Sequence, residues 1–176
     1  MNVIIEKGNK SDADELARLY DDLNDYLASG INYPGWKKGV YPIREDAIMG
    51  IENGELYVAR QSGKIIGSII INHKAEEAYH ETKWNVDTSD YSDILVIHTL
   101  VVHPLYLKNG IGKSLMEFVI ELGKKEQMKS IRLDVYERNT PAIKLYESCG
   151  FLYVATVDLG LSCYGLDYFR LYEKLL

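Results

Sequence analysis

Residues 94–151 constrain the fold of this chain more than any other part of the sequence. They begin with a nearly continuous apolar run at 94–102, which is typical of a strand covered on both faces. A glycine-containing turn follows at 108–113, then a helical pattern, a second strand pattern and a short helix that closes at Gly150-Phe151. This order predicts a pocket for a pyrophosphate beside a gap that can hold an extended ligand.

Length and composition indicate an ordinary globular protein. The chain of 176 residues is 47% hydrophobic, and we expect a single domain, 1–176, with a sizeable core. The formal net charge of −6 argues against a general nucleic-acid binder, although a local basic patch could still exist. Cys149 and Cys163 form no metal or redox spacing, residues 1–6 are too short for a signal peptide, and no apolar run is long enough for a membrane helix. These features favour a cytoplasmic protein.

Hydrophobic periodicity predicts alternating strands and helices, and therefore a mixed α/β sheet. The predicted strands are 3–5, 56–60, 64–72, 94–102, 130–135, 151–158 and 164–174. The predicted helices are 11–28, capped by Ser11, 44–53, 110–126, and a last helix capped by Thr140 and ended by Gly150. Residues 73–93 are predicted to be a long polar excursion with partial helix.

The turn at 108–113 has the composition of an anion site. Gly110 and Gly112 let the backbone approach a ligand, and the amides at the start of a helix favour a phosphate. Two familiar phosphate motifs do not fit. A P-loop requires glycine where Leu107 stands, and a dinucleotide fingerprint requires glycine where Leu115 stands.

The two blocks together resemble the GNAT superfamily of N-acetyltransferases, which use acetyl-CoA. The family pattern is a strand, [RQ]-x-x-G-x-[GA] at the start of a helix, another strand, and N-x-x-A-x-x-L-Y-E-x-x-G-F. The second block matches throughout, from Asn139 to Phe151, and the first departs only at Leu107, where the family has Arg or Gln. The resemblance implies a mostly antiparallel central sheet with helices on both faces and strands splayed at the cofactor site.

The resemblance also implies roles for individual residues. The cofactor would be acetyl-CoA, as a co-substrate, with no metal. The residues implied to hold it are Leu100, Val101 and Val102 along the pantetheine arm, Lys108, Asn109, Gly110, Ile111, Gly112 and Lys113 at the pyrophosphate, and Asn139 and Tyr146. Tyr146 would lie near the sulfur and protonate the leaving thiolate, since a phenol is protonated at pH 7.

The group that accepts the amine proton is left open between three candidates. Asp134 lies on a strand five residues before Asn139, His98 has a suitable pKa, and a chain of water molecules would need no single residue.

The acceptor site and the detailed function are also open. The family builds the acceptor pocket from early helices, loops and last strands, which points to Trp36, Tyr41 and Trp84, with Tyr164 as a further candidate. These aromatics could instead pack a lid against the sheet. The expected partner is a small-molecule or peptide amine, without nucleic acid or membrane, and a homodimer is plausible. The alternatives are a transferase for a longer acyl-CoA and a non-catalytic acetyl-CoA sensor.

Overall fold

A computed structural model describes residues 3–176, so Met1 and Asn2, the start of the segment tested for a signal peptide, lie outside the described residues. The strands are β1 Ile4–Lys7, β2 Leu56–Gln61, β3 Lys64–Asn72, β4 Ile94–Val102, β5 Ser130–Tyr136, β6 Leu152–Val157 and β7 Phe169–Leu175. The helices are α1 Ala13–Ala28, α2 Arg44–Glu52, α3 Glu77–His80, α4 Ile111–Lys125 and α5 Thr140–Ser148. Most predicted elements are therefore found close to their expected bounds.

The strands form a seven-stranded sheet in the order β1-β2-β3-β4-β5-β7-β6. Neighbours pair antiparallel in β1–β2, β2–β3, β5–β7 and β6–β7, whereas β4 and β5 pair in parallel. The parallel ladder joins residues 94–97 to residues 130–133. The predicted class, a mixed and mostly antiparallel α/β sheet, is confirmed.

The chain divides into two compact units. The first contains residues up to Asn32, Trp36–Ile71 and Thr99–Leu115. The second contains Tyr33–Gly35, Asn72–His98 and Met116–Leu176. Both β4 and α4 run from one unit into the other, and the expectation of a single domain stays a prediction.

The first unit is built on the amphipathic helix α1, whose apolar residues recur every three or four positions. The core that forms on this face comprises Leu16, Leu19, Tyr20, Leu23 and Leu27 of α1 with Ala47, Leu56, Val58, Ile65, Ile70 and Val101. The helical segment is preceded by a short 3₁₀ turn that Asn9 caps by accepting from the Ser11 amide. The prediction that Ser11 is the cap was therefore wrong by two residues.

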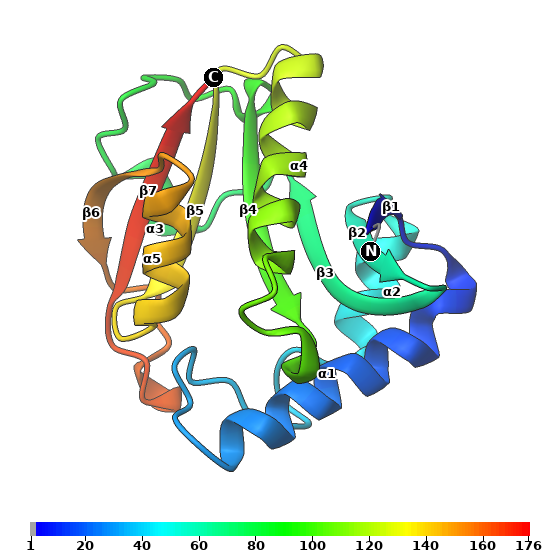
Figure 1. Ribbon diagram of the computed structural model, residues 1–176. Coiled ribbons are helices and arrows are strands. Elements are labelled where there is room, and N and C mark those ends of the chain that lie inside the picture. The colour runs from blue at the N-terminus through cyan, green and yellow to red at the C-terminus, as the bar shows by residue number, and fades with distance from the viewer. Residues whose placement is uncertain (1–2) are drawn as a thin grey trace. The chain divides into compact units, whose positions relative to one another are not determined.

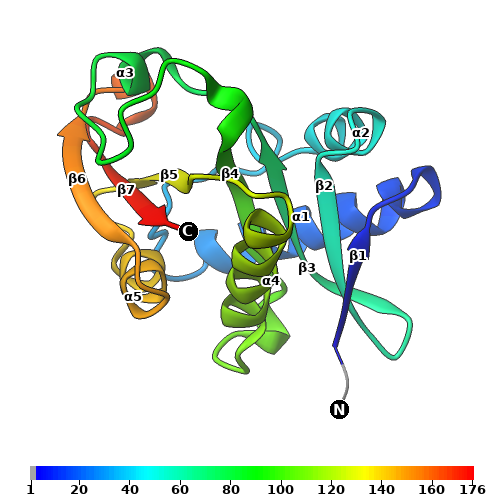
Figure 2. The same ribbon diagram turned by 90° about the horizontal axis from the view of Figure 1, so that it is seen from above.

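The second unit places α3 and α5 on opposite faces of β5, β7 and β6 (Figures 1 and 2). On the α3 face, Tyr79 and Trp84 pack with Ile94, Val96 and Leu171. Because successive strand residues alternate between faces, Leu133 and Tyr172 point to the other side, where Tyr172 donates to Glu147 of α5. The sheet of this unit is thus covered on both faces.

Two predicted boundaries in the second unit are wrong. Asn139, rather than Thr140, caps α5, because its side-chain oxygen accepts from the Ala142 amide at 3.4 Å. Tyr164 belongs to a 3₁₀ turn, Ser162–Tyr164, that ends at the left-handed Gly165, so β7 begins only at Phe169. Within residues 3–176, no helix combines the length and apolar character that crossing a bilayer requires.

Candidate active site

The regular strand geometry of β4 is interrupted at Thr99. Its φ of +39° is rare for a β-branched residue, and the parallel ladder with β5 has already ended at Ile97. Beyond it, Val101 is buried in the first unit's core, while Leu100 and Val102 are half-buried. The three residues implied to line the pantetheine arm therefore lie after a local break in regular strand geometry.

The predicted phosphate turn is exposed and strongly curved. Lys108 and Gly110 both have positive φ angles, +63° and +81°, and residues 107–110 are exposed. A Cβ built on Gly110 meets no described atom within 4 Å, so the space over this backbone is open. The chain then enters α4 at Ile111, whose first amides have no acceptor within the helix. These residues fit a pyrophosphate, which needs an open backbone surface with amide donors.

Trp36 and Tyr41 come together in the first unit. Their rings meet edge to face with centroids 5.6 Å apart, and the Tyr41 hydroxyl is hydrogen-bonded to the Thr99 hydroxyl. Asn24 of α1 donates to the Tyr41 carbonyl at 3.3 Å, while its own Oδ1 is buried with no hydrogen-bond partner among the described residues. Asn24 was not predicted, although a polar residue on the apolar face of α1 is a recognisable signal.

Tyr146 lies on α5 in the second unit, and its ring packs at a tilt against Phe151. Burial, with smaller effects of the Asp134 and Cys149 charges, raises the pKa of Tyr146 well above its usual range. The phenol therefore keeps its proton. Asn139 stands at the beginning of the same helix, where its side-chain oxygen is used as the cap.

Asp134 lies on β5, on the same face as Arg132, and accepts a hydrogen bond from the Tyr79 hydroxyl at 2.7 Å. Burial raises the pKa of Asp134, and the hydrogen bond from Tyr79 partly offsets that effect. A buried carboxylate with a raised pKa suits a proton acceptor near neutral pH. Tyr79 was not predicted, because it lies in the polar excursion far from Asp134 in sequence.

The other candidate base, His98, is the next residue of β4 after the parallel ladder. Its Nε2 is hydrogen-bonded to Oδ1 of Asn72 at 2.9 Å. His98 follows Val96 by two positions, and Val96 pairs with Arg132, so His98 and Asp134 project from the same face of their strands.

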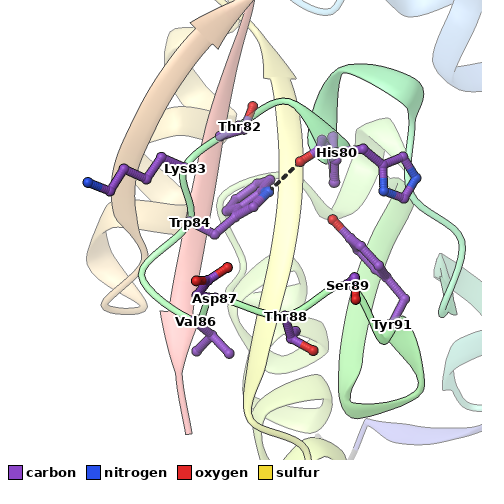
Figure 3. A pocket seen from close by; sticks show the side chains of 10 residues that line it. His80, Thr82, Lys83, Trp84, Val86, Asp87, Thr88, Ser89 and Tyr91 are labelled. Atoms are coloured by element: carbon purple, nitrogen blue, oxygen red, sulfur yellow. Dashed lines mark hydrogen bonds between the residues drawn. The ribbon is translucent and has the colours of Figure 1, made fainter.

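Trp84 packs in the interior of the second unit. It is 8% exposed, its indole nitrogen donates to the Tyr79 carbonyl at 2.8 Å, and the Arg132 guanidinium lies 4.3 Å from its ring centroid. Figure 3 shows this indole between the α3 backbone and the 82–89 loop. A cavity of about 360 Å³ lies here, lined in part by Trp84, His80 and Tyr91. These contacts favour the packing interpretation, and a role of Trp84 in acceptor binding stays a prediction.

Known proteins resemble this chain in both sequence and fold. UPF0157 protein YqkA of Bacillus subtilis is 34% identical over 65% of this chain and 28% of its own length. A streptothricin acetyltransferase from Escherichia coli is 30% identical over 65% of this chain and 58% of its own length. The chain thus spans less than two thirds of either relative.

Solved structures share the fold at low identity. A GNAT-family acetyltransferase from Streptococcus agalactiae superposes with a TM-score of 0.79 at 21% identity, covering 99% of this chain and 95% of that one. The yncA protein of Salmonella typhimurium, solved with its cofactor acetyl-CoA, superposes with a TM-score of 0.70 at 15% identity, covering 100% and 95%.

The profile of the acetyltransferase (GNAT) family matches residues 16–151. This range includes the exposed turn at 107–110 and the start of α4, Asp134 and the complete motif from Asn139 to Phe151. It covers more than half of the chain, and both sequence blocks fall inside it. The chain therefore belongs to the acetyltransferase (GNAT) family.

Proposed function

We propose that this protein is an N-acetyltransferase that moves the acetyl group of acetyl-CoA to a primary amine of a small molecule or peptide. The observation that carries the proposal is the exposed turn before α4, where Gly110 leaves its backbone open at the first amides of the helix. Such a surface suits the pyrophosphate of coenzyme A. Membership of the GNAT family supports the same assignment.

The backbone of residues 100–102 and of the turn before α4 would supply most of the cofactor contacts. The backbone of Leu100, Val101 and Val102 would pair with the pantetheine arm in the manner of an added strand. Residues 108–113 would hold the pyrophosphate through amides, and Lys108 and Lys113 would add positive charge. Because amide donors do not depend on side chains, Leu107 in place of Arg or Gln leaves this part of the site intact.

The reaction would also need a proton donor. Acetyl-CoA brings an acetyl thioester, so forming the amide bond breaks the carbon–sulfur bond and leaves a thiolate that needs a proton. Tyr146 would donate that proton from its phenol, which the raised pKa keeps protonated at neutral pH. Asn139 would hydrogen-bond the cofactor arm with its side-chain amide.

The proton lost by the amine would pass to Asp134 or His98. Asp134 is buried with a raised pKa and has Tyr79 as a hydrogen-bond donor, while His98 has Asn72 as its partner. A proton acceptor must be deprotonated before the reaction and hold a proton after it, and a raised carboxyl pKa suits this task near neutral pH.

The acceptor would be a small molecule or a peptide. Two relatives carry names that fall in these classes, a streptothricin acetyltransferase and a ribosomal-protein bS18-alanine N-acetyltransferase. Trp36 and Tyr41, packed edge to face in the first unit, offer an aromatic surface for an alkyl or cationic amine. We expect the protein to act in the cytoplasm, with no nucleic-acid partner and a possible homodimer.

The test combines binding and turnover. Calorimetric titration should show binding of coenzyme A, and thiol release from acetyl-CoA with a panel of amines should exceed the background. Tyr146→Phe should bind coenzyme A like the parent but lose turnover by on the order of 10²-fold, the scale of a lost general acid. Tyr153→Phe, which removes an exposed hydroxyl on β6 bonded to Thr156, is the matched control and should behave like the parent. Absence of coenzyme A binding by the parent would refute the proposal.

A further inference from the structure

Tyr79 lies in the polar excursion at 73–93, and its side chain is buried in the interior of the second unit. Its side chain is 0% exposed, and its hydroxyl donates to Oδ2 of Asp134 at 2.7 Å. Burial, reinforced by the Asp134 charge, raises the pKa of Tyr79 well above its usual value. The phenol is therefore a fixed donor, and not a group that exchanges its proton at neutral pH.

The neighbouring residues hold Tyr79 by its backbone as well as by its ring. Helix α3 has only four residues, so it has little stability of its own. Trp84 compensates, because its indole nitrogen donates to the Tyr79 carbonyl at 2.8 Å and its ring packs against the Tyr79 ring with centroids 5.1 Å apart. Figure 3 shows the indole reaching back toward this carbonyl.

A buried ion pair holds the segment that carries Trp84. Arg132 of β5 and Glu173 of β7 are both 0–1% exposed and lie 3.0 Å apart. Arg132 also donates to the Val86 carbonyl at 2.6 Å, and Glu173 accepts from the Asn85 amide at 2.8 Å. Side chains of both β5 and β7 therefore form hydrogen bonds with the backbone of the loop directly after Trp84.

Such a network does little for net stability, because two buried charges lose their hydration. The network instead fixes the irregular loop after Trp84 to the sheet. In this position of the loop, the Tyr79 hydroxyl reaches Asp134. A hydrogen bond of this kind orients one carboxylate oxygen and favours the charged form of the group.

We propose that Tyr79 is a positioning residue for the acetyl transfer, which holds Asp134 by Oδ2 so that Oδ1 takes the proton from the acceptor amine. This inference rests on the proposed function. It selects Asp134 over His98 as the proton acceptor, since the network converges on Asp134. It also assigns the excursion at 73–93 a role in arranging the base.

Several titratable groups surround the Tyr79–Asp134 pair. Glu76 and Tyr91 interact electrostatically with Tyr79, and the Asp134 charge in turn affects Tyr146 across the sheet. The interaction between Asp134 and Tyr146 does not involve the Tyr79 hydroxyl, so a variant that lacks only this hydroxyl retains it.

The charged groups on the same face of the sheet are already paired. Arg132 is bonded to Glu173 and to the Tyr91 hydroxyl, and His98 is bonded to Asn72. Removal of the Tyr79 hydroxyl therefore leaves Asp134 buried without its side-chain donor, and the pKa of Asp134 rises further.

The test compares pH profiles of kcat/KM for the parent and for Tyr79→Phe, using an amine from the panel that supports turnover. The acid limb should move to higher pH in Tyr79→Phe, with activity on that limb about 10-fold lower, the scale of a hydrogen bond to a charged group. The matched control is Tyr172→Phe, which removes the hydroxyl of another buried tyrosine, bonded at a partly buried position to a different carboxylate, Glu147. It should keep the parent profile.

A double-mutant cycle with Asp134→Asn separates positioning from general destabilisation. The effect of Tyr79→Phe should disappear when Asp134 is already replaced. An unchanged acid limb in Tyr79→Phe, or an equal loss in the Asp134→Asn background, overturns the inference while the parent's turnover stands. A parent without turnover refutes the proposed function instead. In that case, an NMR titration of ¹³C-labelled aspartate can still compare the pKa of Asp134 in the parent and in Tyr79→Phe. An unchanged pKa would show that the Tyr79 hydroxyl does not affect Asp134.

Discussion

At the scale of single residues, Arg132 and Glu173 form an ion pair whose two charged groups are both buried and both have several polar or aromatic partners. The guanidinium is enclosed by the rings of Trp84 and Tyr91, at 4.3 Å and 5.1 Å from their centroids. Glu173 also accepts from the Ser130 hydroxyl at 2.9 Å. Each charge is therefore satisfied by several partners, which is the condition under which a buried pair is tolerated.

Removal of one partner should be costly. We expect Arg132→Met to lower the free energy of unfolding by about 3 to 5 kcal/mol, because Glu173 would remain charged and buried. Urea denaturation measures this loss. Lys129→Met is the matched control, since it breaks an exposed ion pair with Asp93, the residue before β4, and should leave the unfolding midpoint unchanged. A loss as small as that of the control would show that the pair is not buried in solution.

Some site residues can be predicted from the sequence and others cannot. Tyr146 and Asn139 stand inside a contiguous motif, so local spacing is sufficient to identify them. Tyr79 reaches Asp134 across 55 positions of sequence, and no local pattern encodes that contact. Trp84 illustrates the opposite difficulty, because an aromatic in a polar loop is equally compatible with a ligand site and with packing against Arg132.

At the scale of elements, the turn before α4 depends on a backbone conformation that glycine adopts freely. Gly110 has a φ of +81° with open space over its Cα, as does Gly63, with φ of +78°, in the β2–β3 hairpin. The two positions are alike in conformation and surroundings, but only Gly110 precedes a helix. Substitutions at both positions would cause similar backbone strain, but only a substitution at Gly110 would also affect the predicted phosphate site.

Gly110→Val should weaken coenzyme A binding strongly, because its side chain would occupy the space over the amides. Both Gly110→Val and Gly63→Val should lose about 1 to 2 kcal/mol of stability from the left-handed backbone. Calorimetry and urea denaturation on the two variants separate these effects. Equal affinities for coenzyme A in both variants would contradict a phosphate site at this turn.

The start of α5 combines two tasks in Asn139, whose oxygen caps the helix while its amide is assigned to the cofactor. Asn139→Ala should lose about 1 kcal/mol of stability and also bind coenzyme A less tightly. Asn139→Ser keeps an oxygen for the cap, so its stability should recover while its affinity stays low. Thermal unfolding and calorimetry test both statements, and a serine variant with parental affinity would limit Asn139 to its structural task.

Elements with strong periodicity were predictable, and irregular ones were less so. The alternation and the 3.6-residue spacing identify most strands and helices, because these patterns follow from burial on one face. The last strand is predicted to begin at Tyr164 but begins at Phe169, because the left-handed Gly165 ends a 3₁₀ turn before it. Helix α3 is too short to carry a periodic signal, and tertiary contacts through Trp84 hold it in place.

At the scale of the whole molecule, the alternation of predicted strands and helices was sufficient to predict a mixed α/β sheet, and the resemblance to the GNAT superfamily implied that the sheet is mostly antiparallel. The division into two compact units was not predictable in this way. It depends on which distant residues pack together, as in the clusters around Leu16 and around Tyr79. The two tryptophans fall one in each unit, Trp36 in the first and Trp84 in the second.

This distribution gives a direct test of the single-domain prediction. Since β4 and α4 continue from one unit into the other, we expect the units to unfold together. Trp84→Phe leaves Trp36 as the fluorophore, and Trp36→Phe leaves Trp84. In each variant the fluorescence midpoint in urea should coincide with the midpoint from far-ultraviolet circular dichroism of the same variant. Separate midpoints would reveal two independently folding parts.

The backbone conformation of Thr99 bears on attempts to raise the thermal stability of this protein. It holds a β-branched side chain in a region of backbone space that glycine occupies without penalty. Its hydroxyl, bonded to Tyr41, is what a glycine there would lose. A screen for thermostability alone would therefore favour Thr99→Gly. If the more stable variants lose turnover, the strained backbone at Thr99 contributes to activity at the expense of stability.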